Sequence, residues 1–160
     1  MSVYGGIESG GTKWECAIGT SPEDVRAVAT FPTTTPAETI SRVVDFFPPY
    51  EQQQIRVSLA GSLRGIVAQR LVRRADGLGR CCAVEICVTT GRVAEAIADS
   101  DKTHMIGDLI AQGGYYGMQT FDQHLVVLVR DGVVTVDEAT AVASNPHDLT
   151  VELRRLGLVA

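Results

Sequence analysis

The chain has 160 residues, of which 45% are hydrophobic and 21% are charged. This composition is typical of a folded domain with a core, and it excludes a disordered chain. The formal net charge of −5 gives no general attraction to nucleic acid, so we expect no nucleic-acid partner. No apolar run approaches the roughly 20 residues of a membrane-spanning helix, and no secretory signal is visible. We therefore expect a cytoplasmic setting without direct membrane insertion.

The sequence predicts short strands in the first thirty residues. Val3–Glu8, Lys13–Ile18 and Val25–Thr30 are rich in β-forming residues and are separated by glycine-rich or Ser-Pro segments. Two adjacent hairpins are the simplest arrangement. These strands could also pair with a later strand, Cys82–Val88, and complete a small mixed sheet.

After Phe31 the sequence pattern changes from one typical of strands to one typical of helices. Thr35 can cap a helix whose first residue is Pro36, and Glu38 can complete a capping box. Pro48-Pro49 ends this helix, and the apolar spacing predicts a longer one over about Tyr50–Val72. Asp76-Gly77 then marks a turn, and the nearly continuous apolar run Cys82–Val88 predicts a strand buried in a sheet.

The remaining elements are predicted to be helical. Expected helices cover Arg92–Ala98, about Lys102–Gln112, and a last segment from about Asp148 to Leu156 with Gly157 after its end. Two further capping boxes begin at Thr120 and Thr135. The fold class is therefore α/β in the broad sense (α+β): N-terminal β-hairpins followed by a mainly helical region with one or two strands.

Several polar side chains have both a structural and a functional interpretation. His104, His124 and His147 have no acid–base partner nearby in sequence, so surface or packing positions are favoured. Asp122 and Gln123 are expected to serve a helix cap, and Tyr115-Tyr116 to pack rather than to dock a partner. The cysteines Cys16, Cys81, Cys82 and Cys87 form no Cys-x-x-Cys pair, so we expect free thiols and no zinc site.

Arginines cluster in the middle of the chain. A solvated helix end and turn is the simpler interpretation, and a phosphate or subunit contact is the alternative. The cluster comprises Arg64, Arg70, Arg73, Arg74 and Arg80.

A glycine-rich turn near the N-terminus has the composition of a phosphate site. The backbone N–H groups of Gly10 and Gly11 could converge on an anion, while Thr12 adds a hydroxyl and Lys13 a positive charge. Glu8, just before the turn, could hold Mg²⁺ directly or through water. A glycine-rich hairpin turn without a ligand fits the same residues.

The wider segment resembles the opening of fructokinase-like sugar kinases of the ROK family. The resemblance covers about residues 1–40 and rests on Gly5–Lys13, Cys16–Gly19 and Phe31–Thr35. It implies that Gly10–Lys13 contact ATP phosphates and that Glu8 lies near Mg²⁺. The family's catalytic Gly-Asn-Asp segment, its zinc segment and its second phosphate loop find no match in these residues, so a complete sugar kinase site is not expected.

From about Pro36 to the end, the chain resembles the C-terminal region of the type IV pilus retraction ATPases, the PilT-type twitching-motility family of secretion ATPases. The resemblance rests on blocks in the same order: Ala37–Ile40, Phe46–Gln54, Leu59–Arg64, Gln69–Val72 and Gly117–Gln123. It implies a truncated RecA-like domain from a hexameric ring that drives pilus retraction. Gly91–Ile97 departs from the family's Ala-Ile-Arg motif at the corresponding place.

The two resemblances together predict a chimeric chain, with a ROK-kinase-like segment at residues 1–34 and a pilus-ATPase-like domain at 35–160. ATP and Mg²⁺ are implied by resemblance only. The expected partners are further copies of the chain or pilus-ATPase subunits, and through them the pilus inner-membrane machinery. No Gly-x-x-x-x-Gly-Lys-[Ser/Thr] sequence occurs, so we expect no catalytic residue and an interaction module without turnover alone. The alternative is an ATP-dependent sugar kinase or a nucleotide-binding fragment.

Overall fold

The computed structural model describes the backbone of residues 4–9, 13–21, 24–32 and 35–159, and the side chains of 35–159. The chain divides into two compact units. The first comprises Met1–Leu63 and Thr89–Ile106, and the second comprises Arg64–Val88 and Gly107–Ala160. The two units do not coincide with the predicted segments 1–34 and 35–160. Those segments stay a prediction about the ancestry of the chain.

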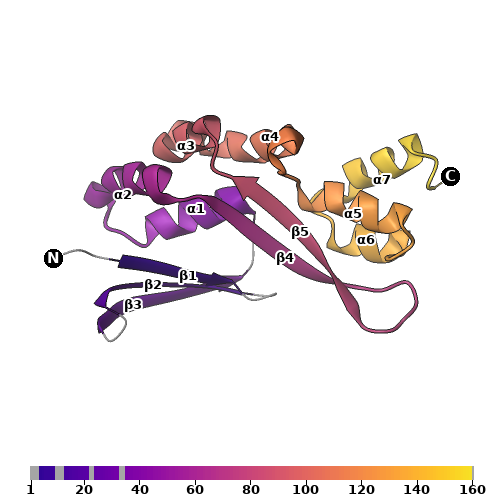
Figure 1. The fold of residues 1–160 in the computed structure, drawn as a ribbon, viewed down its shortest axis with the longest axis horizontal. Coiled ribbons are helices and arrows are strands. Elements are labelled where there is room, and N and C mark those ends of the chain that lie inside the picture. The colour runs from indigo at the N-terminus through magenta and orange to yellow at the C-terminus, as the bar shows by residue number, and fades with distance from the viewer. Residues whose placement is uncertain (1–3, 10–12, 22–23, 33–34, 160) are drawn as a thin grey trace. The chain divides into compact units, whose positions relative to one another are not determined.

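The N-terminal strands form an antiparallel sheet of their own. β1 (Tyr4–Ser9), β2 (Lys13–Ser21) and β3 (Asp24–Pro32) lie in the order β1-β2-β3, as Figure 1 shows. The expected pair of hairpins is confirmed. The alternative that these strands pair with Cys82–Val88 is wrong, because that segment pairs with β4 in a separate sheet.

Four helical segments belong to the first unit. α1 (Pro36–Asp45) begins with the predicted capping box between Thr35 and Glu38. α2 (Pro49–Ser62) packs against α3 (Gly91–Ala98), which continues into the 3₁₀ helix η1 (Ser100–Met105). Among the described residues of this unit, α1 and α3 supply most of the buried apolar side chains, including Ile40, Val44, Val93 and Ile97.

The predicted long helix over Tyr50–Val72 is wrong beyond Ser62. α2 ends there, and β4 (Gly65–Arg73) follows as a strand. Ile66, Ala68 and Val72 are buried while Val67 and Leu71 are exposed. Burial of every second residue is the pattern of a strand. Pairing with β5 makes this segment a strand rather than a continuation of α2.

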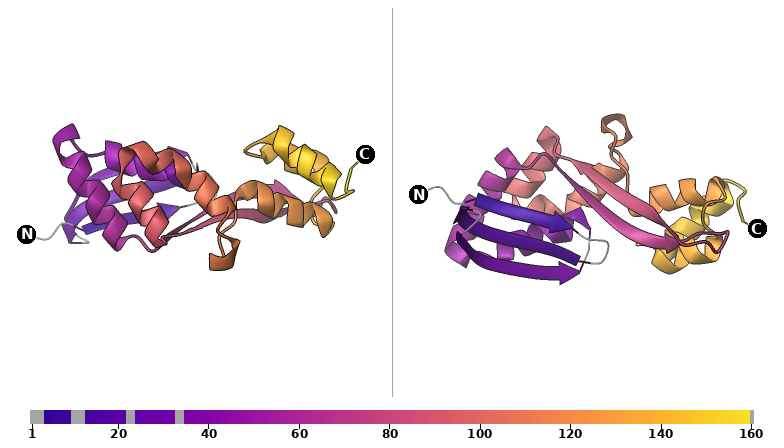
Figure 2. Two further views of the ribbon diagram at one scale, coloured as in Figure 1. Left: turned by 90° about the horizontal axis from the view of Figure 1, so that it is seen from above. Right: turned by 60° about the horizontal axis from the view of Figure 1, so that its bottom comes forward.

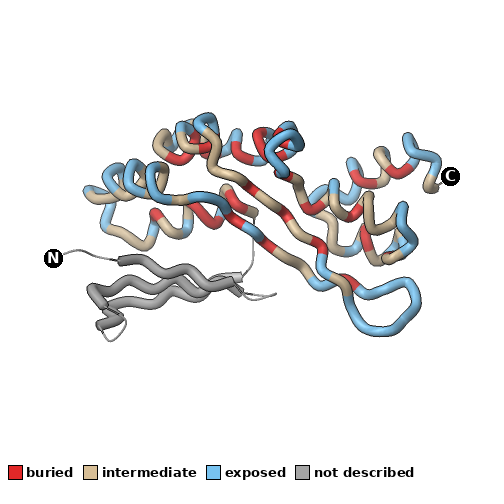
Figure 3. Tube along the Cα trace, in the orientation of Figure 1, coloured by how far each residue is buried: buried red, intermediate tan, exposed pale blue. Residues whose placement is uncertain are grey.

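The second unit is built on the antiparallel β4–β5 hairpin, with β5 covering Arg80–Val88 (Figures 1 and 2). α5 (Phe121–Arg130) packs on β5 and α6 (Val136–Val142) on β4, while α7 (Pro146–Arg155) packs on α5 and α6. Along β5, the buried residues Ala83, Glu85 and Cys87 alternate with less buried ones (Figure 3). The predicted strand is confirmed, but only alternate residues are buried because the helices cover one face of the hairpin.

Local capping signals account for most helix starts and for the ends of α5 and α7. The Thr120–Gln123 capping box is present, whereas at Thr135 only the Thr135 side chain caps α6 and the reciprocal Glu138 bond of the predicted box is not formed. Gly132 and Gly157 take positive φ values of 67° and 71° after α5 and α7. The helix expected over about Lys102–Gln112 is instead divided. η1 ends at Met105, and α4 (Ile106–Ala111) is followed by the short 3₁₀ helix η2 (Gly114–Tyr116).

None of the helices within residues 35–159 combines the length and the hydropathy that crossing a membrane requires.

Candidate functional site

The predicted phosphate loop falls at the turn between β1 and β2. Gly10, Gly11 and Thr12 lie outside the described residues. Glu8 is the second-last residue of β1 and Lys13 is the first of β2, so the two stand at the same end of the hairpin. The register also places Glu15 opposite Glu8, a second carboxylate that sequence reasoning did not single out. Only the strand register could have revealed it.

A polar cluster lies within the second unit, at the middle of the β4–β5 hairpin. Arg70 donates from Nη1 to the carbonyl of Val142 at 2.7 Å and to Oγ of Ser144 at 3.1 Å. Its guanidinium carbon lies 4.1 Å from the centre of the Phe121 ring, a cation–π contact. Arg70 therefore ties β4 to α5 and to the end of α6.

Glu85 is the buried acid of this cluster. It is 5% exposed, and its Oε2 has no hydrogen-bond partner among the described residues. Burial raises the pKa of its carboxyl to about 7, the positive charge of Arg70 opposes that rise, and the negative charge of Asp122 adds to it. The carboxyl can therefore hold or release a proton near neutral pH.

Asp122 has a larger role than the helix cap expected from sequence. Its two carboxylate oxygens accept hydrogen bonds from the backbone N–H groups of Ser144, at 2.7 Å, and Asn145, at 2.8 Å. The capping box of α5 uses Thr120 and Gln123 instead. Asp122 thus fixes the connection between α6 and α7, a contact that spans more than twenty residues in sequence.

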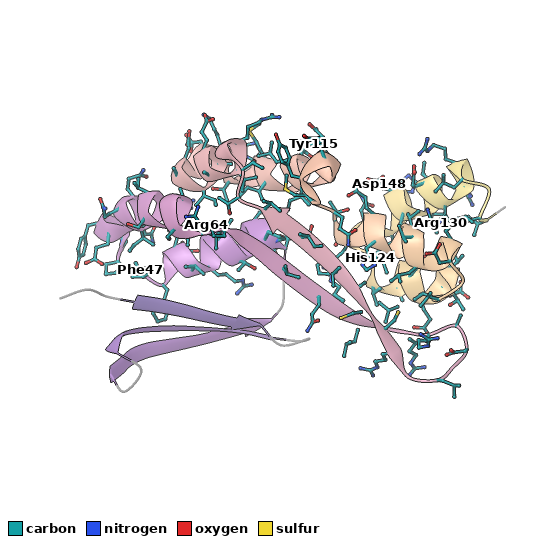
Figure 4. The ribbon with its side chains drawn as sticks, viewed as in Figure 1. Phe47, Arg64, Tyr115, His124, Arg130 and Asp148 are labelled. Carbon is teal, nitrogen blue, oxygen red and sulfur yellow. The ribbon has the colours of Figure 1, made fainter. Side chains whose placement is uncertain are left out.

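The histidines are distributed as structural or surface residues. His124 Nδ1 accepts the backbone N–H of Val84 at 2.9 Å, which joins α5 to β5 (Figure 4). This bond requires the proton on Nε2 in the neutral ring. His104 and His147 are exposed, and His104 shares a shallow depression with Glu38 and Asp45. The packing role expected for His124 is confirmed.

Tyr115 and Tyr116 are not packed in the interior, so that expectation is wrong. Tyr115 is 94% exposed and Tyr116 is 59% exposed. Their rings meet edge to face at 5.2 Å (Tyr115 is labelled in Figure 4). The buried residues of this loop are instead Gly113 and Met118: a Cβ on Gly113 would lie 2.1 Å from Cε of Met118.

The cysteines with described side chains are free thiols. Cys81, Cys82 and Cys87 form no disulfide, and burial raises the pKa of the Cys87 thiol to about 11. Cys82 Sγ donates to Oε1 of Gln69 at 3.0 Å. Within residues 35–159, no group of three His, Cys, Asp or Glu side chains is placed to hold a metal ion.

Most of the chain is similar to proteins of known identity. The twitching motility protein of Neisseria gonorrhoeae is 35% identical over 121 residues, which cover 76% of this chain and 32% of that protein. The crystal structure of the pilus retraction motor PilT with bound ADP matches with a TM-score of 0.65 at 30% identity, over 76% of this chain and 33% of that one. The C-terminal portion of the chain matches twitching-motility ATPases. The chain spans about a third of the length of these relatives.

A second, shorter similarity concerns a different class of protein. The fructokinase of Streptococcus mutans is 44% identical over 57 residues, which cover 36% of this chain and 20% of that enzyme. No protein-family model matches the chain. Both resemblances read from the sequence are confirmed, and the truncated RecA-like α+β fold with them.

Proposed function

We propose that residues 35–160 form an interaction module derived from a type IV pilus retraction ATPase, without nucleotide turnover of their own. The similarity of three quarters of the chain to one third of the motor proteins carries this proposal. Copies of the chain, or subunits of such a motor, are the proposed partners, and the pilus inner-membrane machinery would be reached through them. The cytoplasmic setting belongs to the same proposal.

The sequence supports a module without turnover. Phosphoryl transfer from ATP depends on a phosphate cradle, a metal and a group that positions the nucleophile. The 160 residues contain no P-loop sequence, and the buried polar cluster around Arg70 is occupied by contacts that hold β4, α5 and α6 together. That cluster serves folding rather than catalysis.

Tyr115 and Tyr116 provide a contact surface for a second copy. Tyrosines are enriched at interface hot spots because a large ring is buried at little cost in side-chain entropy. The two rings meet edge to face and are largely exposed, and the same loop packs closely through Gly113 and Met118. The exposed rings are therefore available to a partner.

The test is self-association, measured by light scattering after size exclusion over a range of concentrations. The double variant Tyr115→Ser, Tyr116→Ser is expected to weaken association by about tenfold or more, the loss of two buried rings. Tyr50→Ser is the matched control, since Tyr50 is 83% exposed and lies in the other unit. A chain that stays monomeric at all concentrations, alone and with pilus-motor subunits, would contradict the proposal.

A nucleotide-binding fragment is the second candidate, and the β1–β2 hairpin favours it. Glu8 and Lys13 stand at one end of the hairpin beside the glycine-rich turn, and Glu15 is opposite Glu8 in register. Carboxylate oxygens are ligands of Mg²⁺, and this candidate assigns that role to Glu8. In this candidate, Gly10, Gly11, Thr12 and Lys13 contact the phosphates of Mg-ATP.

Thermal unfolding with and without Mg-ATP separates the two candidates. A ligand that binds only the folded state raises the melting temperature. The fragment candidate predicts a rise that Lys13→Ala abolishes and Lys102→Ala leaves unchanged, because Lys102 pairs with Glu95 in a different element. An unchanged melting temperature in millimolar Mg-ATP rejects nucleotide binding and leaves the interaction module.

A further inference from the structure

Two arginines face each other at the turn end of the β4–β5 hairpin. The register makes Arg73 and Arg80 the last directly opposed pair of the ladder. Directly opposed side chains have Cβ atoms about 5 Å apart, and like charges in that position are destabilising. Both residues are exposed, and neither forms an ion pair with a residue from 35–159. The neighbouring Arg74 is engaged with Asp76 through bonds of 2.8 to 3.2 Å.

The loop that joins the two strands is held in place by backbone contacts. Arg74 N–H donates to Gly79 O at 3.2 Å and Gly77 N–H to Arg74 O at 3.0 Å. Ala75 N–H donates to Val133 O at 2.9 Å, which fastens the loop to the connection before α6. The loop backbone next to the opposed arginines is therefore already held by hydrogen bonds, and a ligand would not have to order it.

A depression of about 490 Å³ lies beside this pair. Thr135 and Glu138 close it from the side of α6, and Gly77 and Gly79 form part of its wall. Thr135 Oγ1 accepts the backbone N–H of Glu138 at 3.3 Å, so its own hydroxyl proton is available to a ligand. The cations lining the depression are Arg73, Arg74 and Arg80.

We propose that this depression binds a phosphate group, with Arg73 and Arg80 as a two-sided clamp and the Thr135 hydroxyl as a third donor. Guanidinium groups match phosphate oxygens with paired N–H donors, and such charge-assisted bonds are about twice as strong as neutral ones. A bound dianion also removes the repulsion between the two arginines. Three donors in a shallow, open site suit an anion with several exposed oxygens better than a single carboxylate.

Glu138 is the one unfavourable group in the lining. Its carboxylate repels an anion, and this weakens binding without blocking it because the depression is open to water. The matched change Glu138→Gln keeps the size of the side chain and removes its charge. The proposal therefore predicts tighter phosphate binding in that variant, which is the opposite sign to the arginine variants.

The experiment measures pyrophosphate binding to the full chain by calorimetry at low ionic strength. Arg73→Ala and Arg80→Ala are each expected to weaken binding by about tenfold, the loss of one charge-assisted contact, and Glu138→Gln to strengthen it about threefold. Arg64→Ala is the control, since it removes the same charge from an exposed position just before β4. No binding of pyrophosphate, or an equal loss in Arg64→Ala, overturns the proposal.

A second arm identifies the source of the phosphate. Flotation with vesicles of phosphatidylglycerol in phosphatidylcholine tests a lipid headgroup. When pyrophosphate binds, vesicle binding that Arg73→Ala removes supports the clamp with a lipid as its source, and an absence of vesicle binding supports a free phosphate compound. Vesicle binding that persists in Arg73→Ala shows that the lipid is not held by the clamp and overturns a lipid source. Thermal unfolding of each variant confirms that the folded chain is being compared.

Discussion

The middle and the turn end of the β4–β5 hairpin carry arginines in opposite situations. Arg70 donates to Val142 and Ser144 and stacks on Phe121, so its charge is used in holding the unit together. Arg73, three residues later on the same strand, is exposed and stands against the like charge of Arg80. Arg70 lies where helices pack on the strand, so its charge is used in structural contacts. Arg73 is exposed, so its charge is available to a ligand.

The largest effect is expected from Arg70→Ala. It removes two charge-assisted hydrogen bonds and one cation–π contact, and it leaves Glu85 without the positive charge that opposes the effect of burial. We expect the free energy of unfolding to fall by roughly 4 kcal/mol. Urea unfolding measures this, and Arg70→Lys should recover only part of the loss because a single ammonium cannot replace the planar group. If Arg70→Ala and Arg73→Ala lowered the free energy of unfolding by the same amount, the contrast between the two positions would be contradicted.

Glu85 makes the middle of the hairpin sensitive to pH. Its folded-state pKa of about 7 lies above the ordinary value of 4.5, so the folded chain holds the proton more tightly than the unfolded chain. Below pH 4.5 both states are protonated. As the pH rises towards 7, only the unfolded state ionises, and the free energy of unfolding should fall by roughly 3 kcal/mol in total.

Urea titrations between pH 4 and pH 8 should show that decline, and Glu85→Gln should flatten it. Glu138→Gln is the control, because Glu138 is less buried than Glu85 and lies outside the cluster. Equal slopes for wild type and Glu85→Gln would show that the carboxyl ionises freely in the folded chain.

Asp122→Ala tests the same region from α5. The change leaves the Ser144 and Asn145 N–H groups without their carboxylate acceptor, and we expect a loss of roughly 2 kcal/mol. Hydrogen exchange should become faster at the start of α7 and remain unchanged in α3. Exchange that is equally fast in both units would instead indicate global destabilisation.

The smallest change is expected at the turn end. Arg73→Thr keeps a β-forming residue while removing one of two opposed like charges, so stability should rise by up to roughly 0.5 kcal/mol at low salt. The gain should vanish in high salt, since the repulsion is screened. A clear loss of stability would mean that Arg73 has a structural role comparable to that of Arg70.

Local signals in the sequence determined a large part of the fold. The capping boxes at Thr35 and Thr120, the glycines after α5 and α7 and the strand over Cys82–Val88 could be predicted because each depends on residues close together in the chain. The two family resemblances also came from sequence, since ordered blocks of residues survive in the chain.

Tertiary structure decided the rest. Ile66–Val72 has the composition of either a helix or a strand, and pairing with β5 makes it a strand. The same pairing sets Arg73 against Arg80, and packing of α5 and α6 on the ribbon buries Glu85 and engages Arg70 and Asp122. These contacts join residues that are distant in sequence. Their register and burial follow from which faces meet in the folded chain, and no local pattern specifies that.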